Sequence, residues 1–150
     1  MPNKIAAYLR PENVRIINRV KDWREAIDES THLLVEQGYI TDNYPKRVIA
    51  LTEEHGSYYI VGKDIALVHA RPEDGVVRQQ LAVTVIQKPV AFFDKPDDPV
   101  RLFITLCAQD SNSHLEMLQE LAEILMDEAR VQKCVQMTDA AALYEEIVNA

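Results

Sequence analysis

Apolar side chains recur at helical spacing in the first third of the chain. Asp22 precedes such a run, Glu25 follows three residues later, and Gly38 closes the run. An Asp at the cap, a Glu in the first turn and a terminal Gly are typical helix boundaries. The pattern therefore predicts a helix that Asp22 caps and that ends at about Gly38.

Further helices are predicted by the same kind of signal. One is expected over about 45–56, with Asn43 as its cap. Ser113 and Glu116 have the spacing of a capping box, in which each side chain bonds the backbone N–H of the other residue. We therefore expect a helix that opens there and runs to about Met126. Two shorter helices are expected near the end of the chain, over about 129–135 and 138–148.

The period of the pattern changes between these helices. Residues 58–61 and 65–68 are short β-branched or aromatic runs separated by the turn-forming residues 62–64, which predicts two strands joined by a tight turn. The runs 81–86 and 100–106 are apolar on both faces, which is typical of strands covered on both sides. Helices before, between and after strands predict an α/β sandwich.

The chain has the size and composition of one domain. It contains 150 residues, of which 47% are hydrophobic, and no Pro/Gly/Ser-rich linker divides it, so we expect a single domain over 1–150. The longest apolar stretches are far shorter than the roughly 20 residues of a membrane-spanning helix. The N-terminal segment has no apolar stretch of signal-peptide length, so we expect no membrane insertion and a cytoplasmic location.

Charge and residue spacing exclude several classes of function. The 16 Lys and Arg residues against 24 Asp and Glu residues give a net charge of −8, which repels nucleic-acid phosphates and favours a basic protein partner. The four glycines form no loop that could cradle a nucleotide phosphate, and the histidines and cysteines lack the spacing of a metal site. We therefore expect neither a cofactor nor a metal. Cys107 and Cys134 are expected to be buried thiols.

Two histidines stand at positions that suit chemistry. His69 follows the apolar run 65–68, and ligands commonly bind at the carboxyl ends of strands in α/β sheets. His114 begins a predicted helix, where unpaired N–H groups favour an anion and disfavour an imidazolium. A neutral His114 could donate a hydrogen bond while His69 acts as a nucleophile toward phosphorus, with Arg71 screening a phosphoryl dianion. A surface or structural role for both histidines is the alternative that spacing leaves open.

The stretch 56–76 carries a family resemblance. It reads GSYYIVGKDIALVHARPEDGV, and residues 110–114 read DSNSH. With these motifs the chain resembles the enzyme IIA components of the bacterial phosphoenolpyruvate-dependent sugar phosphotransferase system, mannitol/fructose superfamily, and most of all the ascorbate type. The resemblance covers nearly the whole chain and implies a mixed β-sheet flanked by helices.

The resemblance also implies a function. Such a protein takes a phosphoryl group from the phosphocarrier protein HPr onto a histidine and passes it to an enzyme IIB, which works with a membrane IIC component during sugar uptake. His69 matches the phosphorylated histidine, through Nε2, and His114 matches the histidine that hydrogen-bonds the phosphoryl group. Arg71 and the amides near Ser113 are the expected phosphoryl-binding groups.

The chain departs from the family pattern at two points. Val68 stands where the family usually has Pro, and 53–54 read Glu-Glu where mannitol and fructose members have Arg-Glu. Arg71 is therefore the candidate replacement for the missing cation. The same departures support an alternative function, a regulatory module that binds a protein partner according to the phosphorylation state of His69.

Overall fold

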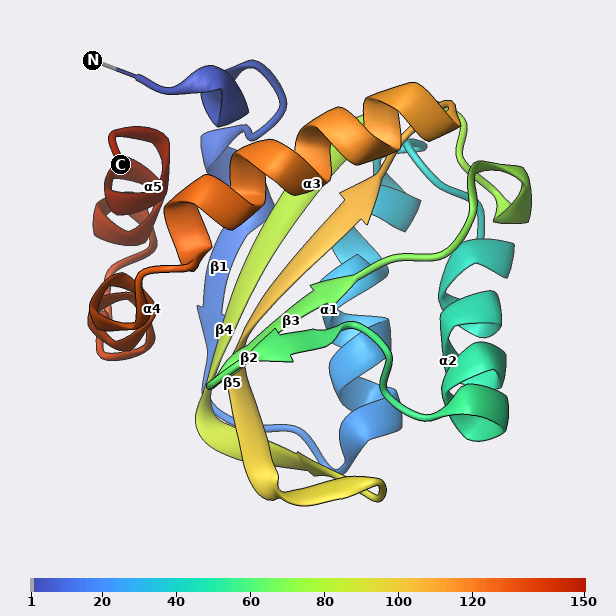
Figure 1. Cartoon of the computed structure of the whole chain (residues 1–150), viewed down its shortest axis with the longest axis horizontal. Helices are drawn as coiled ribbons and strands as arrows, with labels where there is room; N and C mark the ends of the chain where they lie inside the picture. Colours follow the sequence, from blue (N-terminus) through green and yellow to red (C-terminus); the bar gives the residue numbers. More distant parts are fainter. Residues whose placement is uncertain (1) are drawn as a thin grey trace.

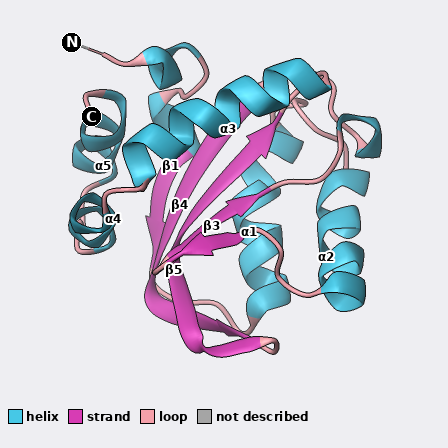
Figure 2. Cartoon of the chain, viewed as in Figure 1, coloured by secondary structure: helices cyan, strands magenta, loops and turns pink. Residues whose placement is uncertain are grey.

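The computed structural model describes residues 2–150 as a five-stranded β-sheet with helices on both faces (Figure 1, Figure 2). The strands lie in the order β1-β4-β5-β3-β2. They are β1 (Val14–Ile17), β2 (Ile60–Gly62), β3 (Ile65–Val68), β4 (Gln80–Phe92) and β5 (Lys95–Cys107). The helices are α1 (Trp23–Glu36), α2 (Asn43–His55), α3 (Ser111–Leu125), α4 (Glu128–Val135) and α5 (Ala140–Val148), with short 3₁₀ helices η1 (Lys4–Ala7), η2 (Pro11–Asn13) and η3 (Pro72–Asp74).

The sheet is mixed, which confirms the predicted fold class. β1 runs parallel to β4 and β3 runs parallel to β5, whereas β4 pairs antiparallel with β5 and β2 pairs antiparallel with β3. α1 and α2 cover one face of the sheet, and α3, α4 and α5 cover the other (Figure 1). The sheet is thus sandwiched between two helical layers.

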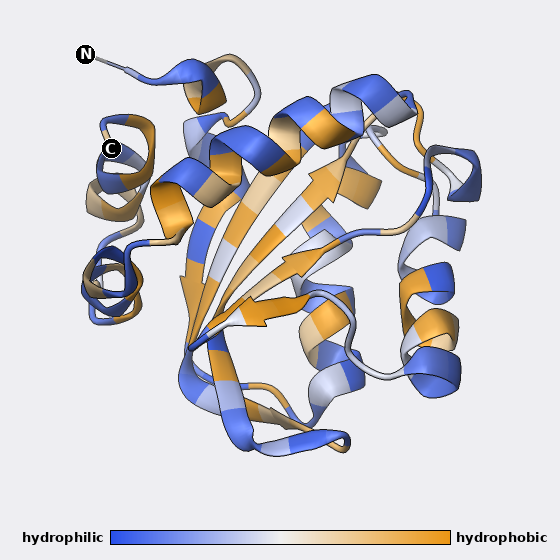
Figure 3. Cartoon of the chain, in the orientation of Figure 1, coloured by the Kyte–Doolittle hydropathy of each residue, from blue (hydrophilic) through white to orange (hydrophobic). Residues whose placement is uncertain are grey.

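The central strands are apolar on both faces because each face meets a helical layer. In β3, Ile65 and Leu67 belong to the core under α3, whereas Ala66 and Val68 belong to the core under α1 and α2. Residues 81–86 are buried throughout, as predicted for a strand covered on both sides. Figure 3 shows hydrophobic residues along the strands, and hydrophobic and hydrophilic residues interspersed along the helices.

The boundaries of α1 confirm the capping prediction. The Asp22 carboxylate accepts a hydrogen bond from the N–H of Glu25 at 3.0 Å, and Gly38 follows the helix with a φ of +82°. Such a φ favours glycine, which is why the helix ends there. The two C-terminal helices also lie where they are predicted, since α4 and α5 begin within two residues of the expected positions.

The predicted cap of α2 is wrong. Asn43 is the first residue of the helix, after Asp42, which makes no side-chain capping bond. The Asn43 amide instead donates from Nδ2 to the carbonyl of Asp74 at 2.9 Å. The side chain that the local pattern predicted as the cap therefore bonds a residue 31 positions further along the chain, and this bond links α2 to η3.

The sequence pattern did not predict β1 or the three 3₁₀ helices. β1 has four residues, and it becomes a strand by pairing with β4, where Val14 lies opposite Val83 and Ile17 opposite Ile86. A run this short carries little periodic signal. Its conformation depends on a partner strand distant in the sequence.

β4 and β5 extend well beyond the predicted runs 81–86 and 100–106 and form one long hairpin around Phe93 and Asp94. The first residues of β5, 95–99, are largely exposed and polar, so an apolar pattern does not reveal them as a strand.

The Asp94 carboxylate at the tip of this hairpin accepts hydrogen bonds from the N–H and the hydroxyl of Ser57, at 2.7 and 2.9 Å. Burial alone would raise the pKa of Asp94, but these hydrogen bonds lower it. The tip thereby anchors the segment that leads into β2.

Both cysteines are buried, as predicted. Burial raises the pKa of Cys107 to about 12 and that of Cys134 to about 11, so neither is a reactive thiolate near neutral pH. In the part of the chain that the structure describes, none of the helices is long and apolar enough to cross a membrane.

Candidate active site

Parallel pairing of β3 with β5 brings His69 and His114 together. Val68 lies opposite Thr105, so the residues that follow both strands emerge at one end of the sheet. His69 comes directly after β3, and His114 lies in the first turns of α3, which follows β5. The centroids of the two imidazole rings are 5.1 Å apart. The predicted pairing of these histidines in space is confirmed.

The two histidines line a cavity of about 940 Å³. α2 contributes one helical face to it, and the rest comes from the segment after β3 and from the start of α3. The lining residues are Arg47, Leu51, Glu54 and His55 from α2, Tyr58, His69, Ala70, Arg71 and Pro72 from the segments around β2 and β3, and Ser111, His114 and Leu115 from α3.

The ring of His69 has one nitrogen committed and one free. Nδ1 lies 2.5 Å from the carbonyl oxygen of Leu67, and a carbonyl can only accept, so Nδ1 carries the proton. Nε2 therefore carries the lone pair. Burial lowers the pKa of His69, although the hydrogen bond to Leu67 opposes this. The ring is thus neutral near neutral pH, and its Nε2 lone pair could act as a nucleophile.

Two tyrosine hydroxyls hold the backbone around His69. Tyr58 donates to the carbonyl of His69 at 2.5 Å, and its ring meets the imidazole edge-on, with centroids 5.4 Å apart. The hydroxyl of the fully buried Tyr44 accepts from the N–H of Ala70 at 2.9 Å and donates to the carbonyl of Leu106 at 2.7 Å. These bonds orient the histidine in a chain that has Val68 rather than proline before it.

We predict that Tyr44→Phe destabilises the fold while the ring still fills its place. The substitution leaves the N–H of Ala70 and the carbonyl of Leu106 without their partner, at about 1–3 kcal/mol for each group that stays buried and unsatisfied. Urea denaturation measures the change. Tyr144→Phe is the matched control, because Tyr144 is a half-buried residue whose hydroxyl makes no hydrogen bond within residues 2–150. An equal loss in both variants would contradict this role for Tyr44.

His114 lies one turn inside its helix rather than at the start. α3 begins at Ser111, and the carboxylate of Asp110 caps it by accepting from the N–H of Ser113 at 2.8 Å. The predicted capping box that opens at Ser113 is therefore wrong. Asp110, three residues before Ser113, caps the helix instead, because it has the extended backbone that a cap requires. The N–H of His114 already donates to the carbonyl of Asp110.

The expected neutrality of His114 has a different cause from the one predicted. Its pKa is lowered first by burial and then by the charge of the neighbouring His69. The helix terminus that was expected to disfavour its charged form is capped by the Asp110 carboxylate. A neutral His114 beside His69 can donate one ring N–H to an oxygen on phosphorus.

The structure places the two expected phosphoryl-binding residues differently. Arg71 lines the cavity with its side chain 65% exposed, and it lies 3.5 Å from carboxylate oxygens of both Glu73 and Asp74. Ser113 does not line the cavity, and its amide is taken by Asp110, whereas Ser111 does line it. The phosphoryl-binding role of Ser113 stays a prediction, with its amide occupied in this structure.

Arg47 is a cavity residue that sequence reasoning missed. It lies on α2 with Leu51 four residues later and Glu54 and His55 seven and eight residues later, all lining the same cavity. That spacing marks one face of a helix and could have revealed the set. His55 is the last residue of that helix and also lines the cavity.

The comparison with known families decides which family the chain belongs to. The family model "Phosphoenolpyruvate-dependent sugar phosphotransferase system, EIIA 2" matches residues 7–150. The chain belongs to this family. It is an EIIA phosphotransferase component of the sugar phosphotransferase system, as its motifs predict.

Relatives of this EIIA include proteins named for two sugars. The mannitol-specific cryptic phosphotransferase enzyme IIA component of Escherichia coli K12 is 35% identical over 125 residues, which covers 83% of this chain and 84% of that one. The ascorbate-specific EIIA component of Shigella boydii is 29% identical over 118 residues, covering 78% and 77%. Identity therefore does not single out the ascorbate type.

Solved structures share the fold of this EIIA. The solution structure of the mannitol-specific cryptic enzyme IIA CmtB from Escherichia coli has a TM-score of 0.92 at 31% identity and covers 99% of this chain and 100% of that one. A complex of enzyme IIAMTL with phosphorylated enzyme IIBMTL from Escherichia coli has a TM-score of 0.81 at 22% identity, covering 95% and 99%, and shows the shared fold.

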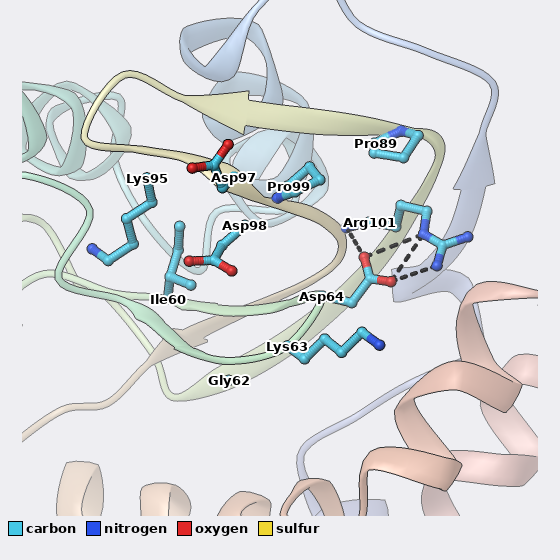
Figure 4. Close-up of a pocket in the computed structure, with 10 residues that line it drawn as sticks. All are labelled: Ile60, Gly62, Lys63, Asp64, Pro89, Lys95, Asp97, Asp98, Pro99 and Arg101. Carbon is cyan, nitrogen blue, oxygen red and sulfur yellow. Dashed lines mark hydrogen bonds and ion pairs between the residues drawn. The ribbon is translucent and has the colours of Figure 1, made fainter.

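A second cavity of this EIIA lies at the opposite end of β3 (Figure 4). It has a volume of about 510 Å³. The Asp64 carboxylate in this cavity forms an ion pair with Arg101, whose Nε lies 3.0 Å from Oδ2. Neither histidine nor cysteine lines it. Within residues 2–150, no group of three or more His, Cys, Asp or Glu side chains is arranged to hold a metal ion.

The lowered pKa values predict a pH dependence for this EIIA. As the pH falls through the lowered pKa of His69, protonation removes the Nε2 lone pair, so phosphoryl uptake is lost on the acid side. The midpoint should lie below the ordinary histidine value of 6.5. Ring ¹⁵N chemical shifts of His69 and single-turnover uptake rates measure it. A His69 midpoint at or above 6.5 would contradict the burial argument.

Proposed function

We propose that this EIIA carries a phosphoryl group on Nε2 of His69, accepting it from phosphorylated HPr and passing it to an enzyme IIB. One observation supports this most directly. The bond from Nδ1 of His69 to the carbonyl of Leu67 assigns the proton to Nδ1 and leaves Nε2 free as the nucleophile, beside His114. A structural histidine has no need of a free ring nitrogen in a cavity lined by a second neutral histidine and two arginines.

The transfer needs no further reactant. The Nε2 lone pair attacks phosphorus in line, and the P–N bond to the histidine of HPr breaks. Positive charge develops on the ring of His69 as the new P–N bond forms, and the carbonyl of Leu67 stabilises it through Nδ1–H. A cysteine thiolate of IIB then attacks phosphorus, the bond to Nε2 breaks, and His69 returns to its neutral form.

The groups around His69 suit the electrostatics of this step. His114 donates to a phosphoryl oxygen without protonating the leaving group, because it is neutral. Arg71 supplies positive charge at the rim of the cavity. Catalysis of phosphoryl transfer consists mainly of such positioning and charge stabilisation.

The surface around the cavity suits protein partners. Leu115 lines the cavity and is 57% exposed, which offers an apolar contact beside the reacting atoms. The net charge of −8 favours a basic donor surface such as that of HPr. The related complex of IIAMTL with phosphorylated IIBMTL supports a IIB partner. We place the reaction in the cytoplasm, where IIB works with a membrane IIC component that recognises the sugar.

The test is the intact mass of the protein after incubation with phosphoenolpyruvate, enzyme I and HPr, followed by a chase with purified IIB. We expect one acid-labile phosphoryl group, and its loss when a cognate mannitol-type or ascorbate-type IIB is added. No gain while HPr is visibly phosphorylated would overturn the proposal. Stable phosphorylation that no IIB removes would favour the regulatory alternative.

A further inference from the structure

Asp74 gathers two guanidinium groups at the mouth of the His69 cavity. Its side chain is 9% exposed, at the end of η3. Nε of Arg47 lies 3.5 Å from Oδ1 of Asp74, and Nε of Arg71 lies 3.5 Å from Oδ2. The backbone N–H of Arg71 also donates to Oδ2, at 3.1 Å. One carboxylate thus holds an arginine from α2 and an arginine from the segment after β3.

Both arginines reach the cavity, whereas Asp74 lies behind them. Arg47 and Arg71 are lining residues together with His69, and Asp74 is not. Arg47 and Asp74 also act on the hydroxyl of Tyr58, which bonds the carbonyl of His69. Burial is the main reason that the pKa of Tyr58 rises to about 12, while the charge of Asp74 raises it further and that of Arg47 lowers it. The pair therefore lies within electrostatic reach of the phosphorylation site.

The two ion pairs keep the arginines beside Asp74, but they are longer than charge-assisted hydrogen bonds. Charge-assisted hydrogen bonds between nitrogen and a carboxylate measure about 2.7–2.9 Å, and these pairs measure 3.5 Å. A phosphoryl group carries close to two negative charges and three acceptor oxygens at neutral pH. It can therefore compete with the Asp74 carboxylate for the guanidinium group of Arg47, and with Asp74 and Glu73 for that of Arg71.

We propose that Arg47 is a phosphoryl-binding residue of this EIIA, and that Asp74 is a positioning residue that holds Arg47 and Arg71 at the cavity until His69 is phosphorylated. The proposal rests on the proposed function and extends it to a residue that the motifs do not mark. Mannitol and fructose members have an Arg where this chain has Glu53, and Arg47, on an earlier turn of α2, supplies the positive charge instead. Phosphorylation then moves the guanidinium groups from Asp74 toward the phosphoryl oxygens.

The test compares Arg47→Gln with Arg130→Gln. Arg130 also makes a loose ion pair, 3.7 Å from Glu146, but it lies on α4 away from the cavity, so both variants lose the same charge. ³¹P NMR of the phosphorylated protein gives the pKa of the phosphoryl group on His69. A nearby cation favours the dianion, so we expect this pKa to rise by about one unit in Arg47→Gln and to stay at the wild-type value in Arg130→Gln. Uptake from phosphorylated HPr should slow by about 10-fold or more in Arg47→Gln only.

Asp74→Asn tests the positioning role. Loss of the competing carboxylate should lower the pKa of the phosphoryl group, the opposite sign to Arg47→Gln. In the Arg47→Gln background that shift should be at least about twofold smaller, because part of it acts through Arg47. A shift of the same size in both backgrounds would overturn the positioning role of Asp74.

The outcomes separate this inference from the proposed function. If wild-type protein takes up no phosphoryl group, the proposed function has failed. If it does, and Arg47→Gln matches Arg130→Gln in phosphoryl pKa and uptake rate, only the role of Arg47 is overturned. Arg47→Lys guards against misfolding of the Gln variant, since it keeps the charge without the planar fork and should give an intermediate phosphoryl pKa.

Discussion

His69→Ala should abolish phosphoryl uptake by this EIIA without unfolding it. The substitution removes Nε2, the ring nitrogen that the Leu67 carbonyl leaves free. The two tyrosine hydroxyls bond the backbone at residues 69 and 70 rather than the imidazole, so an alanine keeps both bonds. Intact mass after incubation with phosphoenolpyruvate, enzyme I and HPr should therefore show no added phosphoryl group. Circular dichroism should show a folded protein.

The matched control is His32→Ala. His32 is a histidine of α1 whose side chain is 59% exposed and pairs with Glu36 at 3.0 Å, so its loss alters the histidine count but not the cavity. This variant should take up one phosphoryl group like the wild type. NMR of the phosphorylated wild type should show the phosphorus on Nε2. Uptake by a folded His69→Ala protein, or a bond to Nδ1, would overturn the assignment.

His114→Ala should leave a folded EIIA that transfers slowly. We expect single-turnover uptake from phosphorylated HPr to fall by about 10²–10³-fold, the usual cost of removing one donor that stabilises charge in the transition state. The side chain of His114 makes no hydrogen bond within residues 2–150, so its removal leaves no donor or acceptor of the fold without a partner. Rapid-quench kinetics with radiolabelled phosphorylated HPr measure the rate.

His114→Gln distinguishes a hydrogen-bond donor from a space-filling ring. Its side-chain amide offers a donor near the position of the imidazole, so it should recover part of the rate that alanine loses. Equal rates for the wild type and His114→Ala would show that His114 takes no part in transfer. A Gln variant as slow as the Ala variant would show that the ring acts in some way other than donation.

Signals between neighbouring residues in the sequence predicted much of this fold. The cap at Asp22 and the glycine at Gly38 bound α1 because caps and left-handed turns depend on a few adjacent residues. The histidine at the end of β3 was visible for the same reason, since an apolar run that stops at a polar residue marks a strand end. The family motif around His69 adds the expectation that this histidine carries the phosphoryl group.

The position of His114 shows how a local signal can be nearly right. Ser113 and Glu116 have capping-box spacing, yet Asp110 takes the cap because its backbone has the extended conformation there. Both choices satisfy the pattern, and the path of the chain out of β5 selects between them. The histidine still reaches the cavity, one turn deeper in the helix, and burial rather than the helix terminus is the main reason for its lowered pKa.

By itself, then, the sequence determined which two histidines stand at strand and helix ends and which helices and central strands surround them, because those features follow from neighbours along the chain. Only the tertiary structure decided that Tyr44 holds the segment after His69 and that Arg47 joins Arg71 at the cavity. The reason is physical. A hydroxyl or a guanidinium group bonds whichever partner the packing of distant segments brings within reach, and such a contact leaves no period in the sequence.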